Sequence, residues 1–518
     1  MYPDSDEGGI PPIPGGRIIR GRVTVIVNRL RASVGNLAAA FALGTLVRLV
    51  LAGKKSIWHD EASSLIIASL PSFDASLIQS LLTHFGAPLF PVVLRFWLAL
   101  GSGDGFVRLL PAIGGIVALW YSLSLARRLL PDRAVLPAAF LVALLPVSIE
   151  YSQEVRAYSW LSAFELYASL ALWRGMTVPG ASWAVHFGSA TALAVLAHPA
   201  AWIWWGAQAV AIPWSRRPRR TLMLFLAYSI PAIALTAAGL YVSRAAWGAR
   251  LGTAFQLPAA GEYLRQALLI FWAGHHVGPG ATLWLPWAAG ALAVAGCAAL
   301  WSRGRRAETV FLLSQAFLPP AAIYAGIALG LSTQLRYVAA SAIPFVLLSA
   351  SGLLLFGRAL GAVVVGILLT LQAEGYYRMH EKPPTLEPTF CLLSKKPARE
   401  ALNLVRGRFR AGDRIVHVST ASLLPFLWME PSIPQCYLIA NPDLAGSVAH
   451  PRVGAPVRIA EALRGARRIW LVSCPWRFSD PPLVPAEFAP ALEKSCDAPR
   501  RYEFPGLCVY LAEVKKSR

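Results

Sequence analysis

The chain has little charge and few carboxylates for its length. Of its 518 residues only 14% are charged, whereas 56% are hydrophobic, and the mean hydropathy is +0.51. An average soluble domain carries nearly twice that charged fraction. The composition therefore argues against an ordinary soluble domain and predicts a polytopic membrane protein.

Several sequence signatures are also missing. The chain contains no CxxC, GxGxxG, P-loop or HExxH motif, no internal repeat and no low-complexity segment. Residues 1–33 are polar, then basic, and lack the apolar core and small-residue cleavage site of an export signal. We expect them to form a cytoplasmic basic segment. The net charge of +21 does not indicate a nucleic-acid partner, because the basic residues cluster in short loops between apolar stretches.

Eleven stretches are apolar enough to be candidate membrane spans, for which about 20 residues are needed. They lie near residues 34–52, 107–126, 134–150, 157–173, 182–197, 200–214, 221–242, 282–301, 309–329, 337–356 and 359–375. The fold class predicted is thus a polytopic α-helical membrane protein with about eleven transmembrane helices over residues 34–375.

The basic clusters predict the orientation. Arginines in 17–31, 127–133, 215–220 and 302–306 should be cytoplasmic by the positive-inside rule. The amino terminus is then cytoplasmic, and residues 53–106 form one long loop on the opposite side. The apolar segment 88–100 in that loop is short and carries Arg95 in its middle, so we expect an interfacial helix there.

From residue 376 the character changes to an α/β domain, 376–518, predicted to be periplasmic. Residues 413–419, 467–473 and 507–514 are typical of buried strands, separated by helical stretches. Five of the six cysteines fall in this domain, namely Cys391, Cys436, Cys474, Cys496 and Cys508. An oxidising compartment would permit disulfides among them, but buried free thiols are an equally good interpretation.

Polar residues gather at the predicted outer ends of the spans. Asp60 and Glu61 follow Trp58 and His59 just after the first span. One of the two carboxylates could be a first-turn residue favoured by a helix dipole, but two adjacent ones exceed what capping requires.

Other polar residues lie on the same predicted side, and they are Lys54, His84, Arg108, Glu154, Arg156, Tyr158, Arg336 and Tyr337. Some could be interfacial anchors. Together they offer a candidate base, candidate phosphate partners, and aromatic rings that could stack on a sugar or lipid.

These segments carry a resemblance to a known group. "WHDEA", "HFGAPLFPVVLRFW", "VRLLPAIGGIVALWYSLSLARRLL", "YSQEVRAY" and "LRYVAASAIP" occur in this order. The set resembles GT-C glycosyltransferases over roughly residues 35–375, in particular the bacterial branch with aminoarabinose transferases of lipid A and relatives of protein O-mannosyltransferases.

The resemblance implies a GT-C fold and transfer of a sugar from a polyprenyl-phosphate donor to a periplasmic glycolipid, polysaccharide or protein, in the inner membrane of a bacterium. By this likeness Asp60 matches the general base, with Glu61 its neighbour, and Arg108 matches a functional arginine at the start of the second span. Glu154 and Arg156 fall in the second outer loop, where the family places another functional polar residue.

One departure concerns the sugar. Aminoarabinose transferases carry a Glu-Lys pair where this chain has Gly86 and Ala87. The phosphate contact of that lysine must come from elsewhere, with Lys54, Lys55 and Arg336 as candidates, and aminoarabinose is not indicated as the sugar.

The residues themselves suggest a mechanism. Displacing a lipid phosphate needs a base for the acceptor proton and positive charge for the leaving phosphate, which a carboxylate and arginines can supply. We expect Asp60 to act as base in an inverting single displacement, with Arg336 and either Arg156 or Arg108 on the phosphate. His59 and His84 could shape the pocket or bind a divalent ion. No cofactor is required, although a divalent metal is possible.

Two other functional classes fit a polytopic chain. A transporter or flippase would place ionisable residues near the midplane of several spans, where Arg48, Glu165 and His186 are the main candidates. A scaffold would use the α/β domain and leave Asp60 and Glu61 unexplained. The sequence favours the enzyme.

Overall fold

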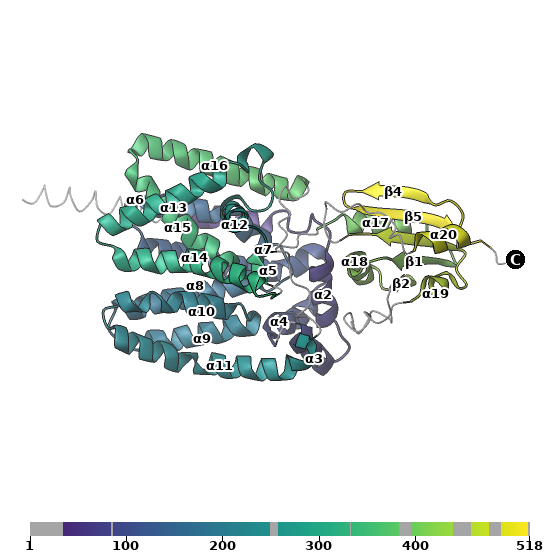
Figure 1. Cartoon of the computed structure of the whole chain (residues 1–518), viewed down its shortest axis with the longest axis horizontal. Coiled ribbons are helices and arrows are strands. Elements are labelled where there is room, and N and C mark those ends of the chain that lie inside the picture. The colour runs from purple at the N-terminus through teal and green to yellow at the C-terminus, as the bar shows by residue number, and fades with distance from the viewer. Residues whose placement is uncertain are drawn as a thin grey trace, which may run out of the picture.

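The computed structural model describes residues 35–83, 86–248, 257–331, 333–382, 395–438, 457–475 and 488–515. These residues form a large helical bundle followed by a smaller α/β part (Figure 1). The predicted basic segment 1–33 lies outside them.

The bundle begins with a helix over Gly35–Leu49. Its longest helices are α5 (Asp104–Leu129), α8 (Tyr158–Thr177), α11 (Pro218–Gly248), α13 (Leu285–Ser302), α14 (Arg306–Ala328) and α16 (Arg358–Glu381). Shorter helices connect or flank them, namely α2 (His59–Ala68), α3 (Phe73–Thr83), α4 (Leu89–Leu98), α6 (Asp132–Ala143), α7 (Pro146–Ser152), α9 (Ser182–Ala197), α10 (Ala201–Ala209), α12 (Ala260–Ala273) and α15 (Ala342–Gly352). Four 3-10 segments complete the bundle, η1 (Ile212–Trp214), η2 (Pro279–Ala281), η3 (Leu335–Ser341) and η4 (Leu353–Leu355).

The helices make the chain a multi-pass membrane protein, but the predicted count of eleven spans is not confirmed. By length and composition, six helices of the described residues could cross a membrane, or seven if the bent pair α6–α7 is one span. Each predicted span coincides with helical structure, but several of these helices are short. The first helix, Gly35–Leu49, and α9 are among the shorter apolar helices, and α10 spans only Ala201–Ala209.

The break between α6 and α7 has a local cause. Pro146 occupies the start of α7, where its missing N–H costs nothing, but its ring disfavours helical geometry at the preceding residue, Leu145. The two helices are bent by 45°. The α7–α8 connection, which carries Glu154 and Arg156, contacts α2 through hydrogen bonds from Val155 N–H to Glu61 and from Arg156 to Ser64.

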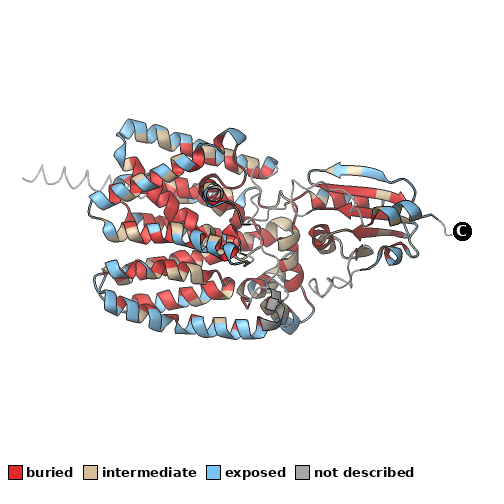
Figure 2. Cartoon of the chain, viewed as in Figure 1, coloured by how far each residue is buried: buried red, intermediate tan, exposed pale blue. Residues whose placement is uncertain are grey.

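Burial separates the inner helices from the outer ones. α15 lies in the centre of the bundle and is buried along nearly its whole length, whereas α11 and α16 present exposed outward faces (Figure 2). Apolar side chains on those faces include Leu360, Val363 and Ile367. The backbones of α13 and α15 approach closely because Gly296 and Gly352 have no side chains. A Cβ at either position would overlap a carbonyl oxygen of the other helix.

The stretch 53–106 holds α2, α3 and α4. The predicted helix at 88–100 is confirmed as α4, and Arg95 in its middle does not face outwards. Its guanidinium donates to the carbonyl oxygens of Ala68 at 3.1 Å and Leu70 at 2.6 Å. These carbonyls lie at the carboxyl end of α2, so Arg95 fastens α4 to α2.

The α/β part is a five-stranded mixed sheet in the order β2-β1-β3-β5-β4. β1 (Asp413–His417) is parallel to β2 (Gln435–Tyr437) and β3 (Arg468–Ser473), whereas β5 (Leu507–Glu513) is antiparallel to β3 and β4 (Arg500–Phe504). The helices are α17 (Ala398–Arg406), α18 (Thr420–Met429), α19 (Ile459–Leu463) and α20 (Ala489–Ser495).

Three strands were predicted and are present as β1, β3 and β5, whereas β2 and β4 were not predicted. Helix α16 continues to Glu381, past residue 375, where the sequence predicted the end of the membrane part and the start of the α/β domain. The described cysteines of this part, Cys436, Cys474, Cys496 and Cys508, are free thiols, so disulfides among these four are not formed. Cys391 lies outside the described residues.

Candidate active site

The predicted polar residues converge from four places in the chain. Asp60 and Glu61 occupy the first turn of α2, and Arg108 lies in the second turn of α5. Glu154 and Arg156 lie in the α7–α8 connection, and Arg336 lies in η3. α2 lies between the bundle and the α/β part, so the cluster is at the end of the bundle that faces the sheet (Figure 1).

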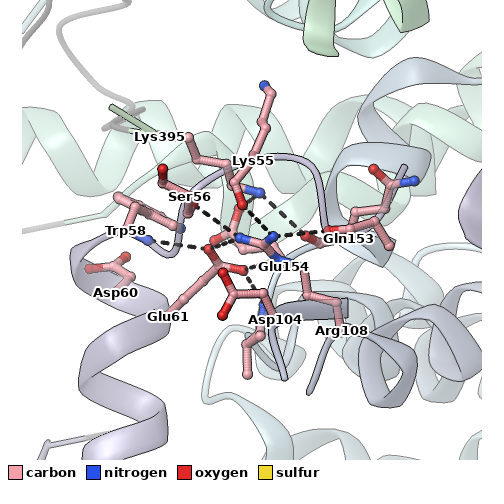
Figure 3. Close-up of polar contacts among 12 residues, drawn as sticks. Lys55, Ser56, Trp58, Asp60, Glu61, Asp104, Arg108, Gln153, Glu154 and Lys395 are labelled. Atoms are coloured by element: carbon pink, nitrogen blue, oxygen red, sulfur yellow. Dashed lines mark hydrogen bonds and ion pairs between the residues drawn. The ribbon is translucent and has the colours of Figure 1, made fainter. Parts of the chain in front are cut away.

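Glu61 and Arg108 form a fully buried, two-pronged ion pair. Nε and NH2 of Arg108 lie 2.9 and 2.7 Å from the two carboxylate oxygens, and neither side chain is exposed. Glu61 also accepts from the backbone N–H of Val155 at 3.0 Å, and the remaining Arg108 donors bind carbonyl oxygens of residues 52–56. Figure 3 shows this network with Glu61 and Arg108 at its centre. The pair locks the start of α2 to α5 and to the α7–α8 connection.

Asp60 points away from this network (Figure 3). Its Oδ2 lies 2.9 Å from NH1 of Arg336, its Oδ1 lies 3.2 Å from Nδ1 of His59, and its side chain is 17% exposed. Burial acts to raise the pKa of Asp60, but the charges of Arg336 and Arg156 outweigh it and hold that pKa well below the ordinary value. Asp60 is thus an ionised carboxylate that an incoming molecule can reach.

Arg156 and three aromatic rings complete the surroundings of Asp60. NH1 of Arg156 donates to Oγ of Ser64 at 3.1 Å. The guanidinium carbon of Arg336 lies 5.6 to 5.9 Å from the ring centroids of Tyr158, Trp58 and Tyr337. Cations and aromatic faces attract one another at such distances, and the same faces can stack on a sugar ring.

Glu154 lies in a different electrostatic setting. Nζ of Lys395 is 3.8 Å from its Oε2, whereas its Oε1 is buried with no hydrogen-bond partner in the described part of the chain. Burial raises the pKa of Glu154 to about 7, against the opposing charge of Lys395 and with the help of Glu61. It is therefore a carboxyl group that can change its protonation near neutral pH.

Two of the predicted residues lie elsewhere. Lys54 is 42% exposed and pairs with Glu381 at the end of α16, not with the Asp60 centre. His84 lies outside the described residues. Among those that are described, no group of three or more His, Cys, Asp or Glu side chains could hold a metal ion.

The departure at positions 86 and 87 has a structural reason. Gly86 has a φ of 78°, which L side chains rarely adopt, and a Cβ there would lie 2.6 Å from the backbone of Gly239 in α11. Ala87 is buried. This turn packs directly on α11 and leaves no room for a side chain at position 86, where the pair has its glutamate, and the lysine of the pair corresponds to the buried Ala87.

The α/β part docks on the segment before Asp60, which the sequence did not predict in residue detail. Arg399 pairs with Asp104 and donates to the carbonyl oxygen of Lys55 at 3.2 Å, and Ser56 Oγ donates to Glu400 at 3.0 Å. Leu424 of α18 packs in one apolar cluster with residues of α2. Through these contacts and that of Lys395, the α/β part covers the site on the side away from the bundle. They join segments far apart in the chain, so no local sequence pattern could have indicated them.

The ionisable residues within the spans do not gather at one place. Arg48 donates to the carbonyl oxygens of Gly44 and Ala143 at 2.7 and 3.0 Å. His186 lies 2.7 Å from the hydroxyl of Tyr167. The buried carboxylate of Glu165 has no hydrogen-bond partner among the described residues. Each of the three has separate surroundings, unlike a transport site shared by several helices.

Comparisons with known proteins bear on the fold. No protein-family model matches the chain, and no curated protein matches it. The structure of ArnT from Cupriavidus metallidurans in the apo state superposes with a TM-score of 0.57 and 15% identity, over 93% of this chain and 98% of that one. ArnT of the same organism bound to undecaprenyl phosphate gives a TM-score of 0.56 and 14% identity, over 92% and 98%. The resemblance to GT-C glycosyltransferases is thereby confirmed at the level of the fold.

Proposed function

We propose that this chain is a membrane glycosyltransferase that moves a sugar from a polyprenyl-phosphate donor to a lipid, polysaccharide or protein acceptor. The observation that carries the proposal is the Asp60 centre: an ionised, accessible carboxylate that lies 2.9 Å from Arg336 and beside aromatic faces. The centre lies at one end of a bundle that shares its fold with ArnT, of which one structure is bound to undecaprenyl phosphate. We place it on the periplasmic face of a bacterial inner membrane, in line with the basic cytoplasmic loops.

The proposed reaction is a single displacement. The acceptor oxygen bonds to the anomeric carbon of the donor sugar as the bond from that carbon to the phosphate oxygen breaks. The acceptor proton passes to Asp60, and the lipid phosphate leaves with the bonding electron pair. The anomeric configuration inverts, and no cofactor is needed. A positioned base of this kind contributes about 10²- to 10⁴-fold to the rate.

Asp60 is a better candidate for the base than Glu61. Both Glu61 oxygens accept from Arg108, one also accepts from Val155, and the side chain is not exposed. An acceptor hydroxyl could approach only by breaking this network, and removing one partner of a buried pair costs about 3–5 kcal/mol. Glu61 therefore positions α2, and Asp60 carries out the proton transfer.

Arg336 links donor binding to the basicity of Asp60. In the ion pair the pKa of Asp60 is held low, which makes it a weak base. A donor phosphate that attracts the Arg336 guanidinium draws that charge away from Asp60 and raises the affinity of the carboxylate for a proton. The base thus becomes effective when the donor is present. Arg108 cannot share this role, because its donors already bind Glu61 and the 52–56 segment.

The experiment that tests the proposal compares the wild type, Asp60→Asn and Asp74→Asn in a deletion strain. Asp74 is an exposed carboxylate in α3 and provides the matched control. Envelope glycolipids, polysaccharides and glycoproteins are followed by mass spectrometry. We expect one sugar-sized mass to disappear on deletion, to return with wild type and Asp74→Asn, and to remain absent with Asp60→Asn.

Two results would contradict the proposal. Full restoration by Asp60→Asn would remove Asp60 as the base. If deletion leaves every envelope glycan unchanged while the protein is expressed, the transferase is rejected, and transport of a lipid or polysaccharide becomes the function to test.

A further inference from the structure

The first ten residues of α16, 358–367, are loosely packed on the bundle. The buried residues of α16 all come later in the helix, and they are Leu368, Gln372, Gly375, Met379 and His380. Only 17% of the apolar window of the helix is buried. A helix of a packed bundle normally buries one face along its length, because protein interiors are close-packed. Residues 358–367 therefore leave a space between α16 and the rest of the bundle.

This space is a cavity of about 820 Å³. Its walls are formed by α6, by the end of α15 with η4, and by α16. Apart from two arginines, every lining residue is apolar, glycine or proline, and examples are Leu136, Phe140, Leu354 and Val365. Ligand pockets usually measure about 300–1,000 Å³, whereas close-packed interiors have few voids larger than a water molecule. The cavity therefore has the size and the lining of a site for an apolar molecule.

Two arginines give the cavity a positive charge. Arg133 lies in the first turn of α6 and Arg358 in the first turn of α16, and both line the cavity and are exposed. Among the described residues, no carboxylate lines the cavity, and neither guanidinium has an ion-pair or hydrogen-bond partner. Two positive charges without a counter-charge repel each other and attract an anion. The cavity thus combines apolar walls with a place for a negative group.

The two helices that carry these arginines begin at the end of the bundle away from the sheet and the Asp60 centre (Figure 1). α16 runs from Arg358 to Glu381, a length of about 35 Å, and Glu381 pairs with Lys54 in the segment before Asp60. The arginines are thus about the thickness of a hydrocarbon core away from Asp60. In the proposed orientation they lie at the cytoplasmic face, so the cavity is separate from the donor phosphate of the proposed reaction.

We propose that this cavity binds one anionic phospholipid of the cytoplasmic leaflet. The phosphate headgroup lies between Arg133 and Arg358, and the acyl chains lie against α6, α15 and α16. A guanidinium donates two parallel hydrogen bonds to phosphate oxygens, so a pair of them suits an anionic headgroup. The inference goes beyond the proposed function and does not depend on it.

Charge and surroundings favour a phospholipid over other occupants. The cytoplasmic leaflet carries a negative surface potential from its anionic lipids, and basic pockets between membrane helices bind their headgroups. Beside the cavity, Leu360 and Val363 of α16 are 54% and 58% exposed, so an apolar surface continues from the cavity to the surrounding lipid. A soluble anion would leave the apolar walls uncovered, and an apolar helix of another protein would leave both arginines without a partner.

The test measures lipid binding to the full-length protein by native mass spectrometry, with phosphatidylglycerol and phosphatidylcholine of identical acyl chains as probes. We expect the double variant Arg133→Gln/Arg358→Gln to bind phosphatidylglycerol about tenfold more weakly, and phosphatidylcholine within about twofold of wild type. The control Arg127→Gln/Arg219→Gln removes the same charge from two exposed arginines outside the cavity. It should change neither affinity by more than about twofold.

Two glycines of α16 permit a second, steric test that leaves both arginines in place. Gly361 lines the cavity, and a Cβ there would meet only the carbonyl oxygen of Leu353, at 3.9 Å. Gly366 does not line the cavity, and a Cβ there would meet no atom within 4 Å. A large side chain therefore finds room at either position, but only at 361 does it occupy the cavity. We expect Gly361→Phe to weaken phosphatidylglycerol binding about fivefold and Gly366→Phe to leave it within about twofold of wild type.

The other outcomes separate the site from its occupant. Unchanged phosphatidylglycerol affinity in both the double arginine variant and Gly361→Phe overturns the site, and if the double variant does not insert normally, Gly361→Phe carries the test. Equal losses of the two lipids in the double variant overturn the anionic headgroup. Arginine-dependent binding of glycerol 3-phosphate that is as tight as that of the lipid overturns the lipid assignment. Undecaprenyl phosphate that binds more tightly than phosphatidylglycerol, and depends on Gly361 and both arginines, overturns phospholipid as the occupant.

Discussion

Arg336 and Asp60 form an ion pair of 2.9 Å that joins η3 to the first turn of α2. The arginine side chain is 7% exposed and the carboxylate 17%, so the pair is mostly buried but still in contact with solvent. A pair between two flexible surface residues would contribute little, whereas this one is oriented by the surrounding rings and by Arg156. Its strength decides at which pH Asp60 loses its charge.

Replacing Arg336 should therefore move the acid limb of the pH–rate profile. Asp60 must be ionised to accept a proton, and activity falls as pH drops through its pKa. In the wild type that pKa is well below the ordinary value, so activity should persist at mildly acidic pH. In Arg336→Met burial remains while the largest opposing charge is gone, so the pKa rises and the acid limb appears at higher pH. kcat/KM measured against pH checks this.

The control for the pH profile is Arg265→Met, which removes an arginine that pairs with Glu262 in α12. Its acid limb should coincide with that of the wild type. An Arg336→Met variant with lower activity but an unshifted acid limb would contradict the coupling between Arg336 and Asp60.

Breaking the Glu61–Arg108 pair should affect stability before chemistry. Glu61→Gln leaves a fully buried arginine without its counter-charge, and removing one partner of a buried pair costs about 3–5 kcal/mol. We expect a lower unfolding temperature in detergent and a loss of activity that follows the loss of folded protein. Asp74→Asn should unfold like the wild type. A Glu61→Gln protein that is inactive yet as stable as the wild type would instead place Glu61 in the reaction.

The sequence could name residues that the structure brings together in the candidate site, but it could not assign a separate role to each of them. Asp60 and Glu61 are adjacent, and successive side chains of a helix point about 100° apart, so one faces Arg108 and the other faces Arg336. Which of the two faces the interior depends on how α2 is oriented against α5. That orientation comes from tertiary packing, which the spacing of residues does not contain.

The fold was predicted in outline, and the differences have physical causes. Apolar content located the helices, but hydropathy could not distinguish a full span from a short helix such as α10 or from the pair bent at Pro146. The short edge strand β2 covers only Gln435–Tyr437 and is too short to show an alternating pattern. The contacts of Lys395 and Arg399 join segments that are hundreds of residues apart, so only the folded chain reveals them.

Glu154 should make the stability of the protein depend on pH. The folded state binds its proton more tightly than the unfolded chain, because the pKa is raised from an ordinary 4.5 to about 7. The ionised form is therefore disfavoured in the folded state, and stability should fall as pH rises from about 4.5 to about 7. Glu154→Gln removes this fall, and the gain relative to wild type at pH 8 should approach about 3 kcal/mol.

Unfolding temperatures at pH 5 and pH 8 test the role of Glu154. The difference between Glu154→Gln and wild type should be large at pH 8 and small at pH 5. Lys395→Met is the informative second variant, since loss of the opposing cation should raise the pKa of Glu154 and extend the fall in stability to higher pH. An equal shift of Glu154→Gln at both pH values would show that its effect is one of packing and not of protonation.

Arg399 should control the order of the segment that leads into Asp60. Its guanidinium pairs with Asp104 and donates to the carbonyl oxygens of Gly53 and Lys55, so it ties the α/β part to that segment. Without it, local opening of residues 53–56 should become easier, and we expect amide exchange there to be about tenfold faster, equivalent to about 1.4 kcal/mol.

Hydrogen–deuterium exchange of Arg399→Ala, with activity measured in parallel, tests this coupling. Because Asp60 follows the loosened segment, activity should fall together with protection at 53–56, whereas α15 in the bundle core should exchange as in the wild type. Arg410→Ala removes an exposed arginine of the same part of the chain and should change neither quantity. If Arg399→Ala exchanges normally at 53–56 but loses activity, Arg399 acts on a substrate directly and the α/β part is more than a cover for the site.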